Sequence, residues 1–340
     1  MSTPKNTTTL ATRKAVVLGS GSWGTALAIV LSKHFDEIVV LGRSEETAEE
    51  INTSHTNSRY LKEVTLPENI YGGTDLAEAQ DADIILFVVP TSATRETVNK
   101  LAEIGIPEST PLISSAKGIE RGTGERMSNI INQSLPNNPI AIISGPTHAE
   151  EVAIGLATCT VVGSVDKQLA QNLQQYFSSP TFRTYTSQDV AGMELGGALK
   201  NVFAIAAGIA AGIGLGDNAI AALVTRGLTE MTRLGTALGG QPETFMGLSG
   251  IGDLMTTCYS PHSRNNRVGM ALGQGLSLQE ACDQLGMVAE GVPNTLSIYE
   301  LARKINIDTP IIDAVYKVLY EDKPALEALS DLLTRDPKAE

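Results

Sequence analysis

Residues 14–41 read KAVVLGSGSWGTALAIVLSKHFDEIVVL, and the order of features in this stretch predicts the architecture of the first half of the chain. Two apolar, β-branched runs, Lys14–Leu18 and Ile38–Leu41, lie on either side of a helical pattern over Thr25–His34. The runs predict strands, and three glycines spaced G-x-G-x-x-G separate the first strand from the helix. Strand, glycine turn, helix and second strand in this order predict an α/β fold that binds a dinucleotide at the turn.

The three glycines of the turn have different roles. Gly19 permits the tight turn, Gly21 lets backbone N–H groups approach a pyrophosphate, and Gly24 lets the helix lie close to the strand. The N-terminus of the helix adds partial positive charge. The same pattern alone is often only a turn, but its position between a strand and a helix favours nucleotide binding.

The residues after the second strand indicate which nucleotide is bound. Folds that prefer NAD usually carry an acidic residue about 20 residues past the glycines, whereas this chain has Gly42-Arg43-Ser44. The planar guanidinium of Arg43 suits the 2′-phosphate of NADP, although a solvated surface arginine is the alternative. We therefore expect NADPH as the cofactor, with NADH also possible.

The pattern of predicted secondary structure changes near residue 188. Before it, strand-like runs recur at helix-length intervals, which is typical of a doubly wound parallel sheet covered on both faces; they are Asp83–Val89, Leu112–Ser115 and Ile140–Ser144, with Thr158–Val165 and Phe182–Thr186 as possible extensions. After it, long Ala-, Leu- and Gly-rich helical patterns dominate. We expect a disordered leader over 1–12, a dinucleotide-binding domain over 13–188 and an all-α substrate domain over 189–340.

Composition excludes several classes of function. The 340 residues carry 25 Lys and Arg against 38 Asp and Glu, a net charge of −13, which argues against nucleic acids and anionic membranes as partners. Three scattered cysteines fit neither a disulfide framework nor a zinc site and indicate a reducing, cytoplasmic compartment. No set of His, Cys and Asp residues has metal-ligand spacing, so no metal is expected.

Lys200 and Asp253 are the candidates for proton transfer. Lys200 lies in a helical segment, residues 194–208, where its neighbours are small and apolar. Burial there would lower its pKa, as an acid/base group requires, although a lysine that reaches out to water is the alternative. The glycine-rich loop that follows residue 247 delivers the carboxylate of Asp253.

A second group of polar residues predicts a phosphate site. Residues 260–267 read SPHSRNNR, in which Ser, Arg and Asn side chains and a helix N-terminus with Pro261 in its first turn form a cradle. The alternative is an ordinary capped surface helix. Two further segments, around Lys117 and around Gly145, end predicted strands, where open parallel sheets bind ligands. The nearby His148 and His262 are assigned structural or peripheral roles.

Seven segments together resemble the bacterial type of NAD(P)-dependent glycerol-3-phosphate dehydrogenase. They are GSGSWGTALA (19–28), SSAKGIE (114–120), SGPTHAEEV (144–152), ELGGALKNVFAIAAG (194–208), GDNAIAALVTRGLTEM (216–231), TFMGLSGIGDL (244–254) and SRNNRVGMALGQG (263–275). The resemblance implies a Rossmann domain joined to a helical substrate domain. It also implies interconversion of dihydroxyacetone phosphate and sn-glycerol 3-phosphate, mainly toward the latter for phospholipid synthesis.

The resemblance also implies roles for individual residues. Lys200 looks like the proton donor and acceptor, and Lys117 like a ligand of both substrate and cofactor. The other matched substrate positions are Gly145, Thr147, Asp253, Ser263, Arg264 and Asn265, and the other matched cofactor positions are Ser22, Trp23, Arg43, Ala149, Arg264, Val288 and Glu290. The chain departs from the family pattern at Thr147-His148, where Ser-Phe is common, and at Val292-Pro293, a stiffer turn.

Two other interpretations are compatible with parts of the sequence. A reductase of a hydroxyacid or ketoacid would share a Rossmann-plus-helical architecture but would take a carboxylated substrate. A non-catalytic NADPH-binding sensor would keep the glycine turn but has no need for Lys200, Asp253 and residues 263–265 together. The Ala- and Gly-rich helices are also suited to close packing against a second subunit, and we expect a homodimer.

Overall fold

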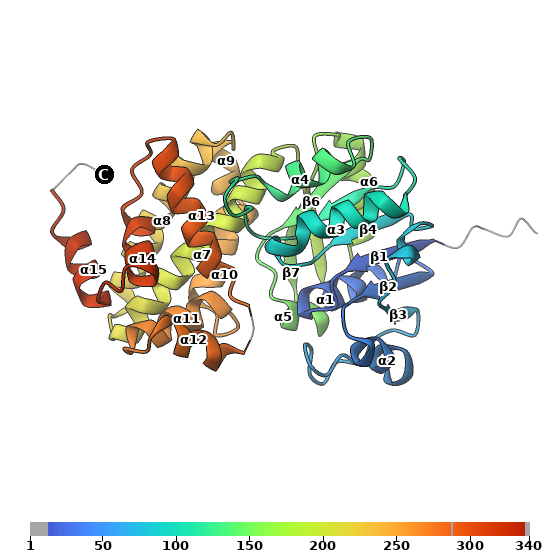
Figure 1. Cartoon of the computed structure of the whole chain (residues 1–340), viewed down its shortest axis with the longest axis horizontal. Helices are drawn as coiled ribbons and strands as arrows, with labels where there is room; N and C mark the ends of the chain where they lie inside the picture. Colours follow the sequence, from blue (N-terminus) through green and yellow to red (C-terminus); the bar gives the residue numbers. More distant parts are fainter. Residues whose placement is uncertain (1–12, 287, 337–340) are drawn as a thin grey trace, which may run out of the picture.

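The computed structural model describes residues 13–286 and 288–336. Figure 1 shows two parts side by side, a sheet flanked by helices and a bundle of helices. The predicted disordered leader, residues 1–12, lies outside the described residues. The two parts correspond to the predicted fold class, a doubly wound sheet followed by an all-α unit.

The first part is built on one eight-stranded sheet in the order β3-β2-β1-β4-β5-β6-β7-β8. The strands are β1 (Lys14–Leu18), β2 (Glu37–Leu41), β3 (Ile70–Gly73), β4 (Ile84–Phe87), β5 (Leu112–Ser114), β6 (Ile140–Ser144), β7 (Thr158–Gly163) and β8 (Phe182–Ser187). All neighbours from β3 to β6 are parallel. The first six strands therefore have the order typical of a Rossmann fold.

The two last strands extend the predicted parallel sheet, but with one antiparallel pairing. β7 runs antiparallel to β6, and β8 runs parallel to β7. The connection between β6 and β7 contains only the short helix α5 (Ala149–Ala153). This connection returns the chain to the sheet on the side where β6 ends. β8 consequently ends on the side of the sheet where β1 to β6 begin.

The strands are apolar on both sides because both faces of the sheet are covered. Val17 and Leu86 face a core that includes residues of α1 (Ser22–Leu31), α5 and α6 (Lys167–Phe177). Val16 and Ile85 face a second core with residues of α3 (Thr91–Ile104) and α4 (Met127–Ser134). The near-continuous apolar runs of the sequence follow from this double burial.

Two features of this part differ from the predicted elements. β3 was not predicted, since Ile-Tyr-Gly-Gly is short and half glycine; Ile70 of this strand is nevertheless fully buried. α1 begins at Ser22 rather than Thr25, so Gly24 lies within its first turn. A helix α2 (Glu45–Ser54) and a 3₁₀ turn (Leu76–Ala79) complete the first part.

The second part is organised around α7 (Val190–Ile213). The surrounding helices are α8 (Asp217–Ala237), α9 (Pro242–Phe245), α10 (Asp253–Tyr259), α11 (Arg264–Gly273), α12 (Leu278–Leu285), α13 (Gly291–Lys304), α14 (Pro310–Tyr320) and α15 (Ala325–Leu333). α7 is long and apolar enough to cross a membrane by length and composition, but 83% of its most apolar window is buried inside the protein. It is therefore the core helix of the second part.

Glycines let α7 and α11 approach each other closely. A Cβ atom at Gly208 of α7 would lie 2.0 Å from the carbonyl oxygen of Asn266 in α11, and one at Gly269 of α11 would lie 2.1 Å from the carbonyl oxygen of Ile205. Such distances are far below van der Waals contact, so only hydrogen fits at both positions. The two helices therefore pack backbone against backbone.

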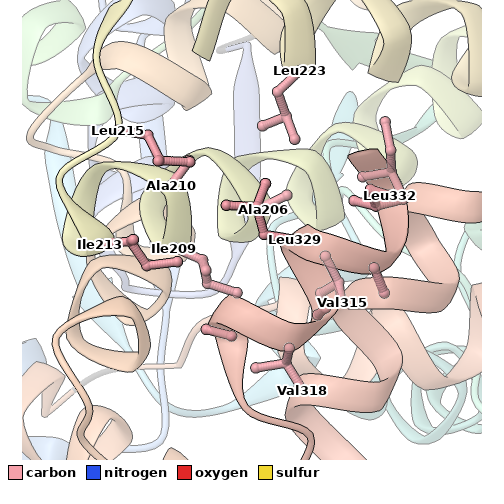
Figure 2. A pocket seen from close by; sticks show the side chains of 14 residues that line it. Ala206, Ile209, Ala210, Ile213, Leu215, Leu223, Val315, Val318, Leu329 and Leu332 are labelled. Carbon is pink, nitrogen blue, oxygen red and sulfur yellow. The ribbon is translucent and has the colours of Figure 1, made fainter. Parts of the chain in front are cut away.

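An apolar cavity lies at the far end of this bundle, under α15 (Figure 2). Figure 2 shows Ala206, Ile209, Ala210 and Ile213 of α7 facing residues of α14 and α15 across it. All its lining side chains are Ala, Val, Leu or Ile. The lining offers neither charge nor hydrogen-bonding side chains, so proton or hydride chemistry has to be sought elsewhere in the molecule.

Candidate active site at the carboxyl ends of the strands

The predicted ligand-binding segments meet at one edge of the sheet. Backbone hydrogen bonds join the ends of neighbouring strands there: Gly19 N donates to Leu41 O, Val88 N to Leu18 O, and Ser115 N to Phe87 O. Since β1, β2, β4, β5 and β6 are parallel, the segments that follow them all emerge at this edge. This is the edge at which open α/β sheets bind ligands.

The glycine turn has the geometry that a dinucleotide requires. Gly19 has φ +125°, and a Cβ atom there would lie 2.6 Å from Val88 O, while one at Gly24 would lie 1.9 Å from Gly19 O. At Gly21 a Cβ would meet no described atom within 4 Å, and no described side chain caps the N-terminus of α1. The backbone N–H groups of the first turn are therefore open to an anion such as a pyrophosphate, and these residues fit the predicted cofactor.

Arg43 lies next to this turn. A Cβ at Gly42 would lie only 2.3 Å from the hydroxyl oxygen of Ser20, so the end of β2 closely approaches the glycine turn. Arg43 itself is exposed, and Ser44 behind it caps α2 by accepting a hydrogen bond from Thr47 N at 3.2 Å. The guanidinium is thus accessible to solvent beside the glycine turn.

α7 begins near the amino ends of the parallel strands and places Lys200 near their carboxyl ends, where ligands bind. A Cβ at Gly163, at the end of β7, would contact Met193 of α7, and one at Gly197, one turn later, would contact Ser144 and Lys117. The helix therefore passes along the side of β6, from its amino toward its carboxyl end. Figure 1 shows the helical part beside the β6–β7 end of the sheet.

Asp253 joins two lysines from different parts of the chain. Lys200 Nζ donates to Asp253 Oδ1 at 2.5 Å and to Thr257 Oγ1 at 2.6 Å. Lys117 Nζ donates to Asp253 Oδ2 at 2.8 Å and to Gly145 O at 2.9 Å. Lys200 is 6% and Asp253 1% exposed, whereas Lys117 is half-buried. One buried carboxylate thus holds two ammonium groups in fixed positions.

The charges of this cluster set its protonation. Burial lowers the pKa of Lys200 to about 7; Asp253 opposes this shift, and the positive charge of Lys117 reinforces it. Burial pushes the pKa of Asp253 upward, but Lys117 and Lys200 outweigh burial and lower it. The aspartate therefore stays ionised while Lys200 can gain or lose a proton near neutral pH.

The segment before Asp253 differs from the predicted loop. Leu248–Gly252 forms a single π-helical turn, and Asp253 is the first residue of α10. A Cβ at Gly196 of α7 would lie 2.4 Å from Ser249 O, and one at Gly250 2.1 Å from Phe245 O. Gly196 thus lets the turn pack closely on α7, and Gly250 lets it pack closely on Phe245 at the end of α9.

A chain of amides connects the lysine cluster to α11. Asn201, next to Lys200, donates to Lys117 O at 3.0 Å, and its side-chain oxygen accepts from Asn265 Nδ2 at 2.9 Å. Asn265 Oδ1 in turn accepts from Gly291 N at 2.9 Å, and Asn294 also donates to Lys117 O. The predicted phosphate residues and Lys200 therefore lie on the same side of the molecule.

The start of α11 corrects one detail of the predicted phosphate cradle. Pro261 is not in the first turn of the helix but in the turn that follows α10. Ser263 caps α11 because its hydroxyl accepts from Asn266 N at 3.2 Å. Arg264 starts the helix, is half-exposed and donates to Val288 O at 3.0 Å.

The remaining predicted residues line the same region. Glu290 accepts from Thr91 Oγ1 at 2.8 Å, which links the helical part to the start of α3, and Val288 is exposed. Thr147 donates to Gly145 O at 3.2 Å, and Ala149 begins α5 and is buried. These positions border the lysine cluster on the side of the sheet and on the side of α13.

Sequence reasoning missed three residues that the structure brings to the cluster. Thr257 binds the ammonium of Lys200, and Asn201 and Asn294 hold the backbone carbonyl of Lys117. Thr257 stands four residues after Asp253, so both lie on one face of α10. Asn201 directly follows Lys200, and a polar residue at that point of an apolar helix was the available signal.

Comparisons with known proteins identify the family. The family models described as NAD-dependent glycerol-3-phosphate dehydrogenase N-terminus and C-terminus match residues 14–170 and 189–330. A glycerol-3-phosphate dehydrogenase [NAD(P)+] of Staphylococcus haemolyticus is 46% identical over 331 residues, which cover 96% of this chain and 99% of that protein. Its counterpart in Bacillus cytotoxicus is 47% identical over 96% of this chain and 97% of that protein.

A solved structure gives the same result. The crystal structure of glycerol-3-phosphate dehydrogenase from Coxiella burnetii superposes with a TM-score of 0.91 at 38% identity, covering 95% of this chain and 99% of that one. The match covers nearly all of both parts of the fold. The chain belongs to the NAD(P)-dependent glycerol-3-phosphate dehydrogenase family.

Proposed function

We propose that the protein reduces dihydroxyacetone phosphate to sn-glycerol 3-phosphate, reversibly, with NADPH or NADH as hydride donor, and so feeds glycerophospholipid synthesis. Membership of an NAD(P)-dependent dehydrogenase family supports the reaction class. The observation that carries the proposal is the buried ammonium of Lys200 bound to Asp253 beside the carboxyl ends of the strands. Reduction of a ketone to an alcohol requires a general acid that protonates the ketone oxygen, and a buried ammonium can act as that acid.

Lys200 is the general acid of the reduction. The reduced nicotinamide, when bound, supplies the hydride for the ketone carbon. Lys200 Nζ donates its proton to the ketone oxygen as negative charge develops there, and in the reverse direction it takes the proton back. A pKa near 7 makes both directions accessible near neutral pH.

Asp253 and Lys117 prepare Lys200 for this transfer. Asp253 fixes the direction of the ammonium and balances its charge, and Thr257 holds a second Nζ hydrogen bond. Lys117, held by Asp253 and by the carbonyl of Gly145, adds positive charge beside the developing alkoxide. Because these groups are hydrogen-bonded before substrate arrives, little reorganisation remains for the reaction itself.

The substrate phosphate binds at the start of α11. Arg264 supplies a guanidinium, and Ser263 and Asn265 with the N-terminus of the helix supply hydrogen-bond donors. Gly145 and Thr147 border the substrate on the side of β6. The amide chain from Asn265 through Asn201 sets the position of this anchor relative to Lys200, which fixes the ketone at a reactive position.

The cofactor lies along the glycine turn and the edge of the sheet. Its binding residues are Gly19, Gly21, Ser22, Trp23, Gly24, Arg43, Lys117, Ala149, Arg264, Val288 and Glu290. The exposed Arg43 at the end of β2 supports a preference for the 2′-phosphate of NADPH. NADH would lose this contact but keep the pyrophosphate contacts of α1.

Initial rates test the function directly. Loss of absorbance of NADPH or NADH on addition of dihydroxyacetone phosphate is the expected result, with glycerol 3-phosphate as the product. A phosphate-free ketoacid, the substrate of the rival reductase interpretation, should give no rate above background. NADPH binding without turnover of any ketone would point instead to the sensor interpretation and contradict the proposal.

Three coarser properties complete the proposal. The boundary between the cofactor and substrate domains falls near residue 188, between β8 and α7. The protein acts in the cytoplasm, consistent with three free cysteines. It forms a homodimer, for which the exposed Ala221 and Ala222 of α8 provide a small-residue surface, and light scattering at assay concentration would detect a mass of one chain if this is wrong.

A further inference from the structure

One polar group of the proposed substrate has no partner in the mechanism above. Dihydroxyacetone phosphate carries a phosphate, a ketone and a primary hydroxyl. The phosphate is assigned to the start of α11 and the ketone oxygen to Lys200. The hydroxyl lies on the far side of the ketone carbon from the phosphate, so its partner should be close to the lysine cluster.

His148 lies at such a place. It is the N-cap residue of α5, directly after Thr147, at the carboxyl end of β6. Its ring is close enough to Lys200, Lys117 and Asp253 for all three charges to act on it. The ring of His262 lies at a centroid distance of 5.7 Å from it, tilted by 54°.

The inner nitrogen of this ring has no partner. His148 Nε2 is buried and makes no hydrogen bond to any residue that the structure describes. A buried polar atom without a partner is destabilising, and native proteins seldom keep one without a reason. A ligand group that donates a hydrogen bond to this nitrogen would be bound selectively.

The ring is neutral at physiological pH and therefore has one accepting nitrogen. Burial lowers the pKa of His148, and Lys200 and Lys117 lower it further, against the opposing effects of the Thr256 backbone and Asp253. A neutral imidazole has one N–H donor and one acceptor nitrogen. Two ammonium groups nearby favour a lone pair, not a second proton, on the buried side of the ring.

We propose that His148 is a substrate-binding residue whose Nε2 accepts a hydrogen bond from the primary hydroxyl of dihydroxyacetone phosphate. This inference rests on the proposed function and adds a specificity determinant to it. The ring distinguishes a hydroxymethyl group from a methyl group beside the ketone, because only the hydroxyl can satisfy the buried nitrogen. It gives His148 a direct part in recognition in place of the structural or peripheral role expected from sequence.

The test compares two substrates in His148→Phe and in the wild type. Acetol phosphate carries a methyl group where dihydroxyacetone phosphate carries the hydroxymethyl group, and the two are otherwise identical. Phe keeps an aromatic ring but removes both nitrogens. We expect the preference of kcat/KM for dihydroxyacetone phosphate over acetol phosphate to fall by about tenfold, the effect of one neutral hydrogen bond, while acetol phosphate is reduced about as fast as before.

Two further variants make the result specific. His262→Phe changes the exposed neighbouring ring and leaves Nε2 of His148 in place, so the preference should stay as in the wild type. His148→Gln retains an accepting oxygen and should keep more of the preference than His148→Phe. Turnover of acetol phosphate in each variant reports that the active site is folded.

The outcomes separate this inference from the proposed function. An unchanged preference in His148→Phe would overturn the inference and leave the function intact. An equal loss in His148→Phe and His262→Phe would also overturn it, because packing between the rings would then be the cause. If the wild type reduced neither ketone, the proposed function would fail, and the inference with it.

Discussion

Two groups of residues lie near the carboxyl ends of the strands and differ in burial. One is the lysine cluster, Lys200 with Asp253, and the other is the ligand-binding rim, which contains Arg43, Arg264 and Val288. Lys200 and Asp253 are buried, and each is held by hydrogen bonds from at least two directions. Arg43 is exposed, and Val288, whose carbonyl holds Arg264, is 54% exposed. The groups that transfer a proton are thus buried and hydrogen-bonded in advance, whereas Arg43 and Val288 are exposed to solvent.

This difference has a physical reason. A proton donor must stay within about 3 Å of its acceptor, and its pKa depends on burial and on fixed neighbouring charges. A phosphate is recognised by charge and by several donors at once, so a flexible guanidinium can adapt to it. Substitutions of Lys200 or Asp253 should therefore change the rate of the chemical step, and substitutions of Arg264 or Arg43 should change the binding of substrate or cofactor.

The largest effect is expected for Lys200→Met. Loss of the general acid should lower kcat for dihydroxyacetone phosphate by about 10²–10⁴-fold, while the dissociation constant of NADPH changes little. Rates and NADPH fluorescence titration measure the two quantities. Lys100→Met, at an exposed lysine of α3, is the matched control and should leave both unchanged. A Lys200→Met enzyme with wild-type turnover would remove Lys200 from the mechanism.

Asp253→Asn should show how the cluster sets the pKa of Lys200. In the wild type the pKa near 7 means that reduction, which needs the protonated amine, slows as pH rises above about 7. Asp253 favours the charged amine, so its neutralisation should lower that pKa and move the fall in kcat to lower pH. We also expect a roughly 10²-fold lower kcat at the optimum. A pH profile that does not move would show that Asp253 does not act through Lys200.

Arg264→Ala should affect substrate binding more than turnover. Loss of a charge-assisted contact to phosphate is worth about 1.5–3 kcal/mol, or an increase of about 10–150-fold in KM for dihydroxyacetone phosphate. Arg183→Ala, at an exposed arginine of β8, is the control and should have little effect. If kcat of Arg264→Ala fell by as large a factor as KM rose, Arg264 would act on the chemical step as well as on binding, and the distinction between the two groups of residues would be wrong.

Arg43→Ser should give the smallest effect and act on one cofactor only. We expect KM for NADPH to rise by about tenfold and KM for NADH to change less than twofold, because NADH has no 2′-phosphate. Initial rates with both cofactors measure the ratio. Equal changes for the two cofactors would assign Arg43 a general electrostatic effect.

The sequence was a good guide wherever a local pattern determined the structure. The glycine turn, seven of the eight strands and the central helix α7 follow from apolar periodicity and from glycine conformations, and the family could be identified from contiguous motifs. Lys200, Asp253 and Lys117 were found as candidates because each lies in such a motif. That they share one carboxylate was not visible, since Lys117 and Asp253 are 136 residues apart.

The elements that were missed depend on tertiary contacts. β3 is a strand because Ile70 is buried and its backbone pairs with β2, not because Ile-Tyr-Gly-Gly favours that state. The π-helical turn before Asp253 follows from its contact with Gly196 of another helix. The reversed direction of β7 depends on how a five-residue helix connects it to β6. Spacing along the chain does not encode any of these contacts.

The backbone contact between α7 and α11 has a consequence for substrate length. Lys200 is on one of these helices and Arg264 on the other, and a side chain at Gly208 or Gly269 would force them apart. If Lys200 donates the proton and Arg264 holds the phosphate, as proposed, this helix contact sets the distance between the two groups, and a ketone one carbon away from its phosphate ester has to match that distance. A homologous ketose phosphate with one more methylene between these groups would fit one end only, and an alanine at either glycine would move the tolerance toward longer chains.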